Sequence, residues 1–361
     1  MAGRGDGVGG AEPPAPRRRF ALPGGWRERP ERAVALALAG VAAIAVLGVL
    51  GLRSTFSADA TSSLEVNEIP VSGAPSEIAV AGGRVWTLDL PARRLRALDP
   101  TTGEQVGGLT LGGPASYATS LAAGAGAVWV SLGDGAGGGV IARVDPATFA
   151  AHLTRLPRSI PERLVVGARS LWVLGSDRLS RTAFGGPGRV PAPDQVQELW
   201  SSIDLAVGYG SAWAVTQDTA GGRIGGSRLV RIDETSGAVV LERSLGGAST
   251  AVAVGAGAVW IANGCAQGLV RMPVRAGGAR CVEVDAGLTD LAVGGGGVWG
   301  ADHDGSALVE LDARTGRVRS RAALPARPSG VALGLGAVWA VSEHGAVYRL
   351  GEAPARPGAE V

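Results

Sequence analysis

The chain repeats one short pattern of small and apolar residues that ends in tryptophan. One copy reads VAVGAGAVWIA over residues 252–262, and another reads LAVGGGGVWGA over residues 291–301. In the second copy the pattern continues as TDLAVGG, GGVWGAD, SALVELD and RVRSRAALP, separated by turn residues. An apolar period of two broken by glycine predicts four short β-strands, and the glycine content disfavours helix.

Seven tryptophans carry this repeat at spacings of 39 to 47 residues, namely Trp86, Trp129, Trp172, Trp213, Trp260, Trp299 and Trp339. Glycine stands five residues before the tryptophan in six copies, and Ala81 is the exception. Four strands per unit of about 40 residues are typical of a β-propeller blade. The sequence therefore predicts an all-β, seven-bladed β-propeller, with small residues near its axis and tryptophans between its sheets.

The last copy lacks a fourth strand, because APARPGAEV follows AVYRLGE near the C-terminus. The stretch LEVNEIPVSGAPSE, residues 64–77, resembles EQVGGLTLGGPASY, residues 104–117, which is a fourth strand with its exit. We expect residues 64–71 to complete the seventh blade and leave no exposed sheet edge. The propeller then covers residues 64–352, and residues 353–361 form a disordered tail.

An uncharged apolar run at residues 33–52 precedes the propeller. It predicts a transmembrane helix over residues 32–53, with a linker over 54–63. Arginines crowd its N-terminal side, so residues 1–31 are expected to form a disordered cytoplasmic tail. The protein would then be a single-pass protein of the cell membrane with an extracytoplasmic propeller. A cleaved signal peptide ending near Ala58-Asp59-Ala60 is the alternative.

The motif VAVGAGAVWIAN, with the turns DETSG and DARTG, resembles the seven-bladed propellers called YncE-like, YVTN or NHL-like. That group includes the streptogramin (virginiamycin B) lyases. The resemblance covers about residues 64–352 and implies the fold. It implies little about activity, because this scaffold hosts many unrelated functions.

The charge composition narrows the choice of partners only slightly. The net charge of +2 gives no indication of a nucleic-acid partner. All 34 basic residues are arginine, which is typical of a GC-rich coding sequence, so the arginine content does not indicate a function.

Polar side chains are expected to gather on the loop-bearing face of blades five, six, seven and one. The candidate ligand-binding residues lie three or five residues after a tryptophan, or nine before one: Glu77, Asp89, Asn263, Asp290, Asp302 and Asp304. Such a patch would attract a cation, with Mg²⁺ or Ca²⁺ possible, or a basic ligand. The alternative is that exposed turns are simply polar. The leading hypothesis is a binding or scaffolding module for an extracytoplasmic protein or small ligand.

An enzyme is the second hypothesis. Resemblance to streptogramin lyases implies a His in one blade, a Glu and a His in the next, and magnesium; the matching residues are His303, Glu343 and His344. Glu343 and His344 are adjacent, which would aim their side chains apart on a strand. GxSxG, Walker and HExxH motifs are absent from the sequence.

Cys265 and Cys281 are the only cysteines. An even number outside the cytoplasm favours a disulfide. However, they are expected at opposite ends of a third strand, about 20 Å apart, whereas a disulfide needs Cα atoms within about 7 Å. We therefore expect two unpaired cysteines.

Overall fold

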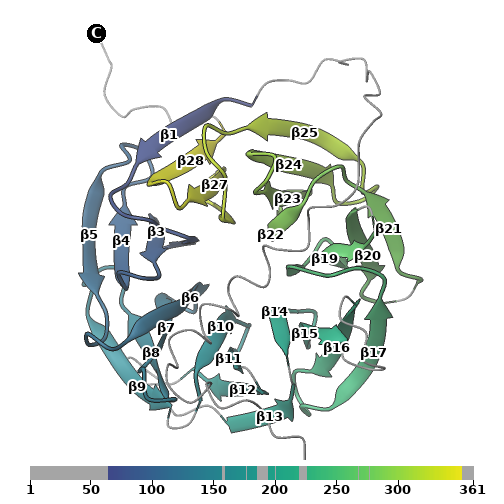
Figure 1. The fold of residues 1–361 in the computed structure, drawn as a ribbon, viewed down its shortest axis with the longest axis horizontal. Coiled ribbons are helices and arrows are strands. Elements are labelled where there is room, and N and C mark those ends of the chain that lie inside the picture. Colours follow the sequence, from purple (N-terminus) through teal and green to yellow (C-terminus); the bar gives the residue numbers. More distant parts are fainter. Residues whose placement is uncertain are drawn as a thin grey trace, which may run out of the picture. The chain divides into compact units, whose positions relative to one another are not determined.

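A computed structural model describes residues 64–351 apart from 157–158, 176, 185–193, 200, 219–225, 267 and 276. These residues form seven four-stranded antiparallel sheets arranged as a ring, the predicted seven-bladed propeller (Figure 1). Each of the first six blades uses four consecutive strands, innermost first. This order places seven short strands around one axis.

The strand bounds follow the predicted repeat. Blades one to three are β2–β5 (Glu77–Ala81, Arg84–Asp89, Arg94–Leu98, Gln105–Thr110), β6–β9 (Tyr117–Gly124, Ala127–Gly133, Gly139–Val144, Ala151–Leu156) and β10–β13 (Pro161–Val166, Ser170–Gly175, Arg178–Ala183, Asp194–Glu198). Blades four to six are β14–β17 (Ser202–Gly208, Ser211–Asp218, Gly226–Asp233, Val239–Leu245), β18–β21 (Val252–Gly255, Ala258–Cys265, Gly268–Pro273, Arg280–Glu283) and β22–β25 (Leu288–Gly294, Gly297–Asp302, Ala307–Asp312, Val318–Ala323).

Blade seven is closed by the N-terminal strand, as predicted. It contains β26 (Gly330–Gly334), β27 (Ala337–Ser342), β28 (Ala346–Leu350) and β1 (Val66–Pro70). β1 pairs antiparallel with β28, from Val66 opposite Leu350 to Pro70 opposite Ala346. The first and last strands of the propeller therefore share one sheet, in which β1 covers the outer edge of β28.

The predicted membrane helix (32–53), its flanking segments (1–31 and 54–63) and the C-terminal tail (353–361) lie outside the described residues. Within the part of the chain that the structure describes, no helix is long and apolar enough to span a membrane.

The recurring glycine five residues before each tryptophan is required by the neighbouring blade. A Cβ built on Gly255 would lie 2.6 Å from Cγ1 of Val293 on the next innermost strand. The same steric conflict recurs around the ring for Gly124 with Val166, Gly208 with Val254, and Gly334 with Val80. The exception, Ala81, is accommodated because blade two carries Ala123 where other blades carry valine or leucine. Small residues therefore let the innermost strands approach closely.

The seven repeat tryptophans are buried in the propeller core, and five of them are covered by an arginine on the third strand of the same blade. Trp260, for example, is directly opposite Arg271, whose guanidinium lies 5.4 Å from the ring centroid. The other four pairs are Trp129–Arg143, Trp172–Arg181, Trp213–Arg231 and Trp339–Arg349. Arginine thus has a repeated structural role through cation–π contact, which composition alone did not indicate.

The expectation of two unpaired cysteines was wrong: Cys265 and Cys281 form a disulfide with a Cα–Cα distance of 6.0 Å. Cys265 is opposite Gly268 at the start of β20. β21 is only four residues long and places Cys281 opposite Val270, two residues along β20. Both cysteines therefore lie near the same end of β20, whereas the prediction placed them at opposite ends.

Candidate functional site

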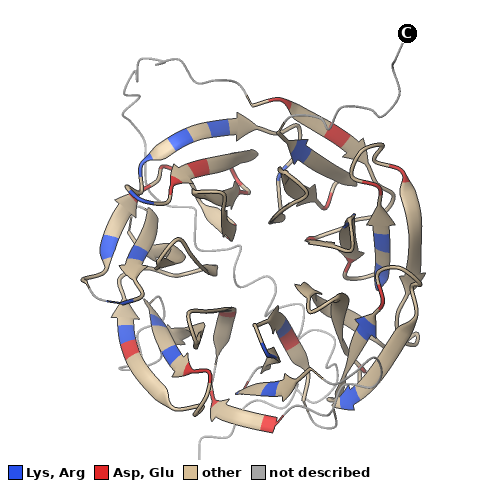
Figure 2. Cartoon of the chain, turned by 180° about the vertical axis from the view of Figure 1, so that it is seen from behind, with Lys and Arg blue, Asp and Glu red and all other residues tan. Residues whose placement is uncertain are grey.

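A polar cavity of about 430 Å³ occupies the centre of the ring, lined by residues of the innermost strands and the segments that precede them. Most charged residues of the propeller lie on outer strands and loops (Figure 2). The seven innermost strands carry only five, and all five line this cavity: Glu77, Glu162, Arg163, Asp204 and Asp290. Charge at the axis is therefore the exception in this molecule.

Most of these groups occupy one repeated place, nine residues before the tryptophan of their blade, which we call the channel position. In three blades its side chain accepts a hydrogen bond from a backbone N–H of the next innermost strand. Asp204 Oδ2 accepts from Val252 N at 2.8 Å, and Asp290 Oδ2 accepts from Val331 N at 2.8 Å. The third acceptor–donor pair is Ser120 with Leu164. Innermost strands of adjacent blades share no ladder, so these side chains satisfy otherwise unpaired donors.

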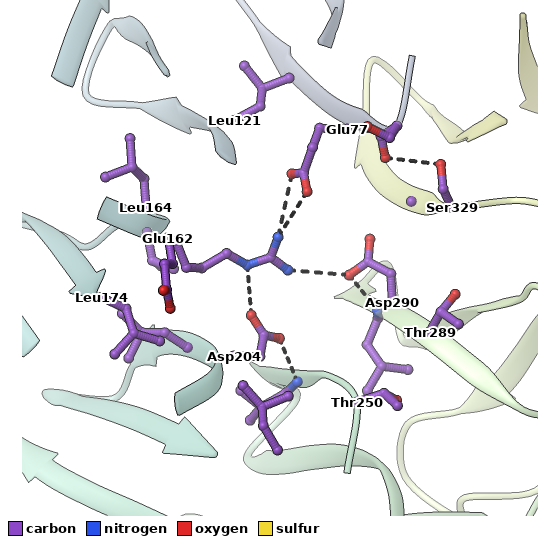
Figure 3. Close-up of a pocket in the computed structure, with 18 of the residues that line it drawn as sticks. Glu77, Leu121, Glu162, Leu164, Leu174, Asp204, Thr250, Thr289, Asp290 and Ser329 are labelled. Atoms are coloured by element: carbon purple, nitrogen blue, oxygen red, sulfur yellow. Dashed lines mark hydrogen bonds and ion pairs between the residues drawn. The ribbon is translucent and has the colours of Figure 1, made fainter. Parts of the chain in front are cut away.

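Blade three breaks this pattern because its channel position holds Arg163, which can only donate. Its Nε donates to Asp204 Oδ1 at 2.7 Å, and its Nη1 donates to Glu77 Oε1 at 3.3 Å. Its Nη2 lies 3.9 Å from Asp290 Oδ1. Figure 3 shows the three carboxylates, from blades one, four and six, pointing toward the same guanidinium.

Burial is the main cause of the raised pKa values of three cavity carboxyl groups. Burial, opposed by Arg163 and reinforced by Asp290, raises the pKa of Glu77 from 4.5 to about 7. Burial likewise raises the pKa of Asp290, and it raises that of Glu162 with help from Asp177. The attraction of Asp204 leads the effects that raise the pKa of Arg163, which stays charged. Groups of this kind cluster at functional sites, although structural ion networks also perturb pKa values.

Of the sequence-predicted residues, Glu77 and Asp290 are the two that line the central cavity. Asp89 and Asp302 are buried at the ends of second strands, where they hold turns: Asp89 accepts from the backbone N–H groups of Ala74 and Ala92. Asp302 accepts from Gly305 N and from Arg321.

Asn263 bridges two blades. Its Nδ2 donates to Thr250 Oγ1 and to the Leu288 carbonyl, each at 3.0 Å. Its backbone φ of 51° lies in the left-handed region, which asparagine tolerates.

The candidate catalytic residues His303, Glu343 and His344 lie in two separate turns. His303 and Asp304 are in the β23–β24 turn, with His303 Nδ1 3.2 Å from Asp304 Oδ1, and 83 % of the Asp304 side chain is exposed. Glu343 and His344 are in the β27–β28 turn, where the His344 backbone N–H donates to Ser342 Oγ. Among the residues that the structure describes, no group of three or more His, Cys, Asp or Glu side chains is placed to hold a metal ion.

Sequence reasoning missed Arg163 and Asp204 as site residues. The signal was present, because both stand at the channel position beside Glu77 and Asp290. Arginine was set aside as a compositional bias, and Asp204 was outside the blades grouped as a patch. Only the closed ring shows that blades three and four face blades one and six across the axis.

No family model and no curated protein matches this sequence. Solved structures do match the fold. Virginiamycin B lyase from Staphylococcus aureus aligns with a TM-score of 0.62 and 16% identity, over 80% of this chain and 99% of that one. Hydrazine synthase from Kuenenia stuttgartiensis aligns at 0.58 and 12%, over 78% and 97%. A chain of the mitotic checkpoint complex aligns at 0.65 and 11%, over 86% and 98%. At these identities the likeness is one of fold, and it defines this chain as a seven-bladed β-propeller protein.

Proposed function

We propose that this chain is a membrane-anchored, extracytoplasmic binding module that takes a small organic cation in the central cavity of its propeller. One observation carries the proposal: three carboxylates from different blades converge on a single guanidinium, that of Arg163. With Glu77 protonated the cluster has a net charge of −1, and with Glu77 ionised it has −2. A bound cation would neutralise charge that the protein leaves unbalanced.

The hydrogen-bonding character of the lining supports a ligand rich in donors. Four hydroxyls around the cavity donate to backbone carbonyls, so their remaining capacity is as acceptors. They are Ser202 to Leu199, Thr250 to Leu288, Thr289 to Ala301 and Ser329 to Ser76. Together with the carboxylates they form an acceptor-rich wall, which suits ammonium or guanidinium groups.

The size of the cavity favours an organic ligand over a bare ion. A volume of about 430 Å³ lies within the usual range of small-molecule sites. The carboxylates come from blades one, four and six, so the cavity wall carries acceptors on more than one side. A compound with two separated cationic groups fits this distribution of charge.

The cellular placement rests on two features. Residues 32–53 are long and apolar enough to form a membrane anchor, with arginines on the N-terminal side. The Cys265–Cys281 disulfide is of a kind that persists in oxidising compartments. Protease added to spheroplasts should therefore remove the propeller and leave residues 1–31 protected; a protected propeller would contradict the placement. A soluble mature protein beginning near Thr61 would indicate a cleaved signal peptide.

Binding is tested by calorimetric titration of the detergent-solubilised full-length protein with 1,4-diaminobutane. Its uncharged analogue 1,4-butanediol serves as the matched ligand control. We expect the diamine to bind, more tightly at pH 8 than at pH 6 as Glu77 ionises, and more weakly at high salt. The diol should not bind.

Two variants locate the site. Asp290→Asn removes one cavity charge and should weaken diamine binding about tenfold. Asp304→Asn removes an exposed charge from the β23–β24 turn and should leave binding unchanged. The reverse result would move the site to the outer loops, and equal binding of diamine and diol would refute the proposal.

A further inference from the structure

Trp299 of blade six departs from the packing rule that the other tryptophans follow. Five tryptophans lie opposite an arginine that covers the ring, and Trp86 is covered by Phe149 with ring centroids 5.5 Å apart. Opposite Trp299 stands Glu310. Among the described residues, no arginine or aromatic ring covers Trp299, and the residue is 8% exposed where the other six are 0–1% exposed.

The indole nitrogen of Trp299 is also placed differently. Five other tryptophans donate their Nε1–H to the carbonyl five residues earlier, as Trp339 does to Gly334 at 3.0 Å. Among the described residues Trp172 and Trp299 lack this bond. The Trp172 nitrogen is buried without a partner, whereas the Trp299 nitrogen lies close to Gly297. A Cβ built on Gly297 would lie 3.2 Å from Trp299 Nε1 and 3.3 Å from Glu310 Oε1. A donor and a carboxylate acceptor therefore lie side by side at Gly297.

These groups open into a pocket of about 420 Å³ between blades six and seven. Trp299 and Glu310 line it together with Leu333, Leu350 and the glycine turns that begin at Gly294 and Gly334. Those turns end the innermost strands, whereas the channel positions begin them, so this pocket and the central cavity lie at opposite ends of β22 and β26.

The charge beside Trp299 is negative. Glu310 accepts from Arg319 at 3.2 Å and from Ser320 at 2.9 Å. Arg319 also pairs with Asp312, so two carboxylates share one guanidinium and one negative charge is left over. An aromatic ring with an adjacent unbalanced carboxylate is complementary to a cation with an apolar stem.

We propose that this pocket binds the arginine side chain of a partner polypeptide. The incoming guanidinium would take the place that the chain's own arginine occupies in five blades, over the tryptophan and beside the carboxylate. Arginine is favoured over lysine because a planar guanidinium stacks on an indole and pairs with a carboxylate through two N–H groups. This site is independent of the central cavity and of the ligand proposed for it.

The probe for this proposal is N-acetyl-L-arginine methylamide, titrated into the full-length protein with 15N-labelled tryptophan indoles. The uncharged citrulline analogue is the matched control. We expect the arginine probe to shift the Trp299 indole signal, assigned with Trp299→Phe, with a dissociation constant on the order of 1 mM. Shifts of other indole signals only, or equal shifts with citrulline, would overturn the proposal.

Two variants at position 310 sharpen the test. Glu310→Gln removes the charge and should weaken binding about fivefold. Glu310→Arg would place an arginine opposite Trp299, as in five other blades. The new side chain should occupy the pocket and abolish binding of the probe, while the protein remains folded. Unchanged affinity in Glu310→Gln would overturn the proposal even if Glu310→Arg failed to fold.

The chain's own C-terminal residues offer another guanidinium, because Arg356 follows Gly351, which lines the pocket. Deletion of residues 352–361 separates the two sources. Unchanged probe affinity supports a partner's arginine. Affinity that rises about tenfold would show that the chain fills its own pocket, and would overturn the assignment to a partner.

Discussion

Arg163 Nε donates a hydrogen bond to Asp204 Oδ1 at 2.7 Å, while the other oxygen of Asp204 accepts from the backbone of Val252 at 2.8 Å. A single buried carboxylate thereby connects blades three, four and five at the axis of the ring. The same groups that stabilise the ring also form the wall of the central cavity, so changes there affect stability and binding together.

Replacement of Arg163 by alanine should destabilise the protein strongly at alkaline pH. Removal of the guanidinium leaves Glu77, Asp204 and Asp290 without their shared cation. Loss of one partner of a fully buried ion network costs about 3–5 kcal/mol, and because Arg163, Glu77 and Asp290 are only partly buried we expect a loss of about 2–3 kcal/mol. The loss should be smaller at pH 5, where protonation relieves the repulsion. Denaturant unfolding at pH 5 and pH 8 measures both values, with exposed Arg314→Ala as the control. Equal losses at the two pH values would indicate that Arg163 acts through packing alone.

Glu77 should make the protein less stable as the pH rises toward neutrality. Its pKa is about 7 in the folded chain, against 4.5 as its ordinary value. Between these values the folded state holds a proton that the unfolded state has released, so the free energy of unfolding falls as pH rises. The shift corresponds to on the order of 3 kcal/mol, complete above about pH 7. Glu77→Gln should flatten the pH dependence of stability between pH 4.5 and 7. An identical pH profile in the variant would show that another group, such as Asp290, dominates.

The contact between Gly255 and Val293 predicts a rescue experiment. Gly255→Ala places a methyl group against Val293 and should cost about 1–3 kcal/mol. Combining it with Val293→Ala recreates the arrangement of Ala81 and Ala123, so the double variant should lose less stability than the sum of the single variants. Gly278→Ala, where nothing lies within 4 Å, is the control. Strict additivity of Gly255→Ala and Val293→Ala would contradict the steric explanation.

The Cys265–Cys281 disulfide should contribute measurably to stability. It closes a loop with a sequence separation of 16 residues. A loop of this length gives about 3 kcal/mol in the chain-entropy account. The Cys265→Ser, Cys281→Ser double variant should therefore melt at a lower temperature than the oxidised protein, and the reduced wild-type protein should match it. A melting temperature that is insensitive to reductant would contradict this contribution.

Sequence alone predicted the architecture because repetition constrains it. Seven tryptophans at spacings of 39 to 47 residues, each preceded by small residues and a glycine turn, allowed the blades to be counted and the closing strand at residues 64–71 to be located. Local alternation determines a strand, and identical blades must solve the same packing problem. The sequence also selected Glu77 and Asp290 as candidate ligand-binding residues, although it placed them in a patch on the loop-bearing face and not in the central cavity.

Only the tertiary structure determined which residues contact Glu77 and Asp290. Arg163 is 86 residues from Glu77 in sequence and meets it only because the ring closes across the axis. The cysteine pairing depended on the register of β21, which shifted Cys281 along β20 to the same end as Cys265. The lack of an arginine over Trp299 depended on which side chain stands opposite it in β24. The alternating pattern determines which face of a strand is buried, but it does not determine which residues of distant strands become partners, because a shift of two residues keeps the same face buried.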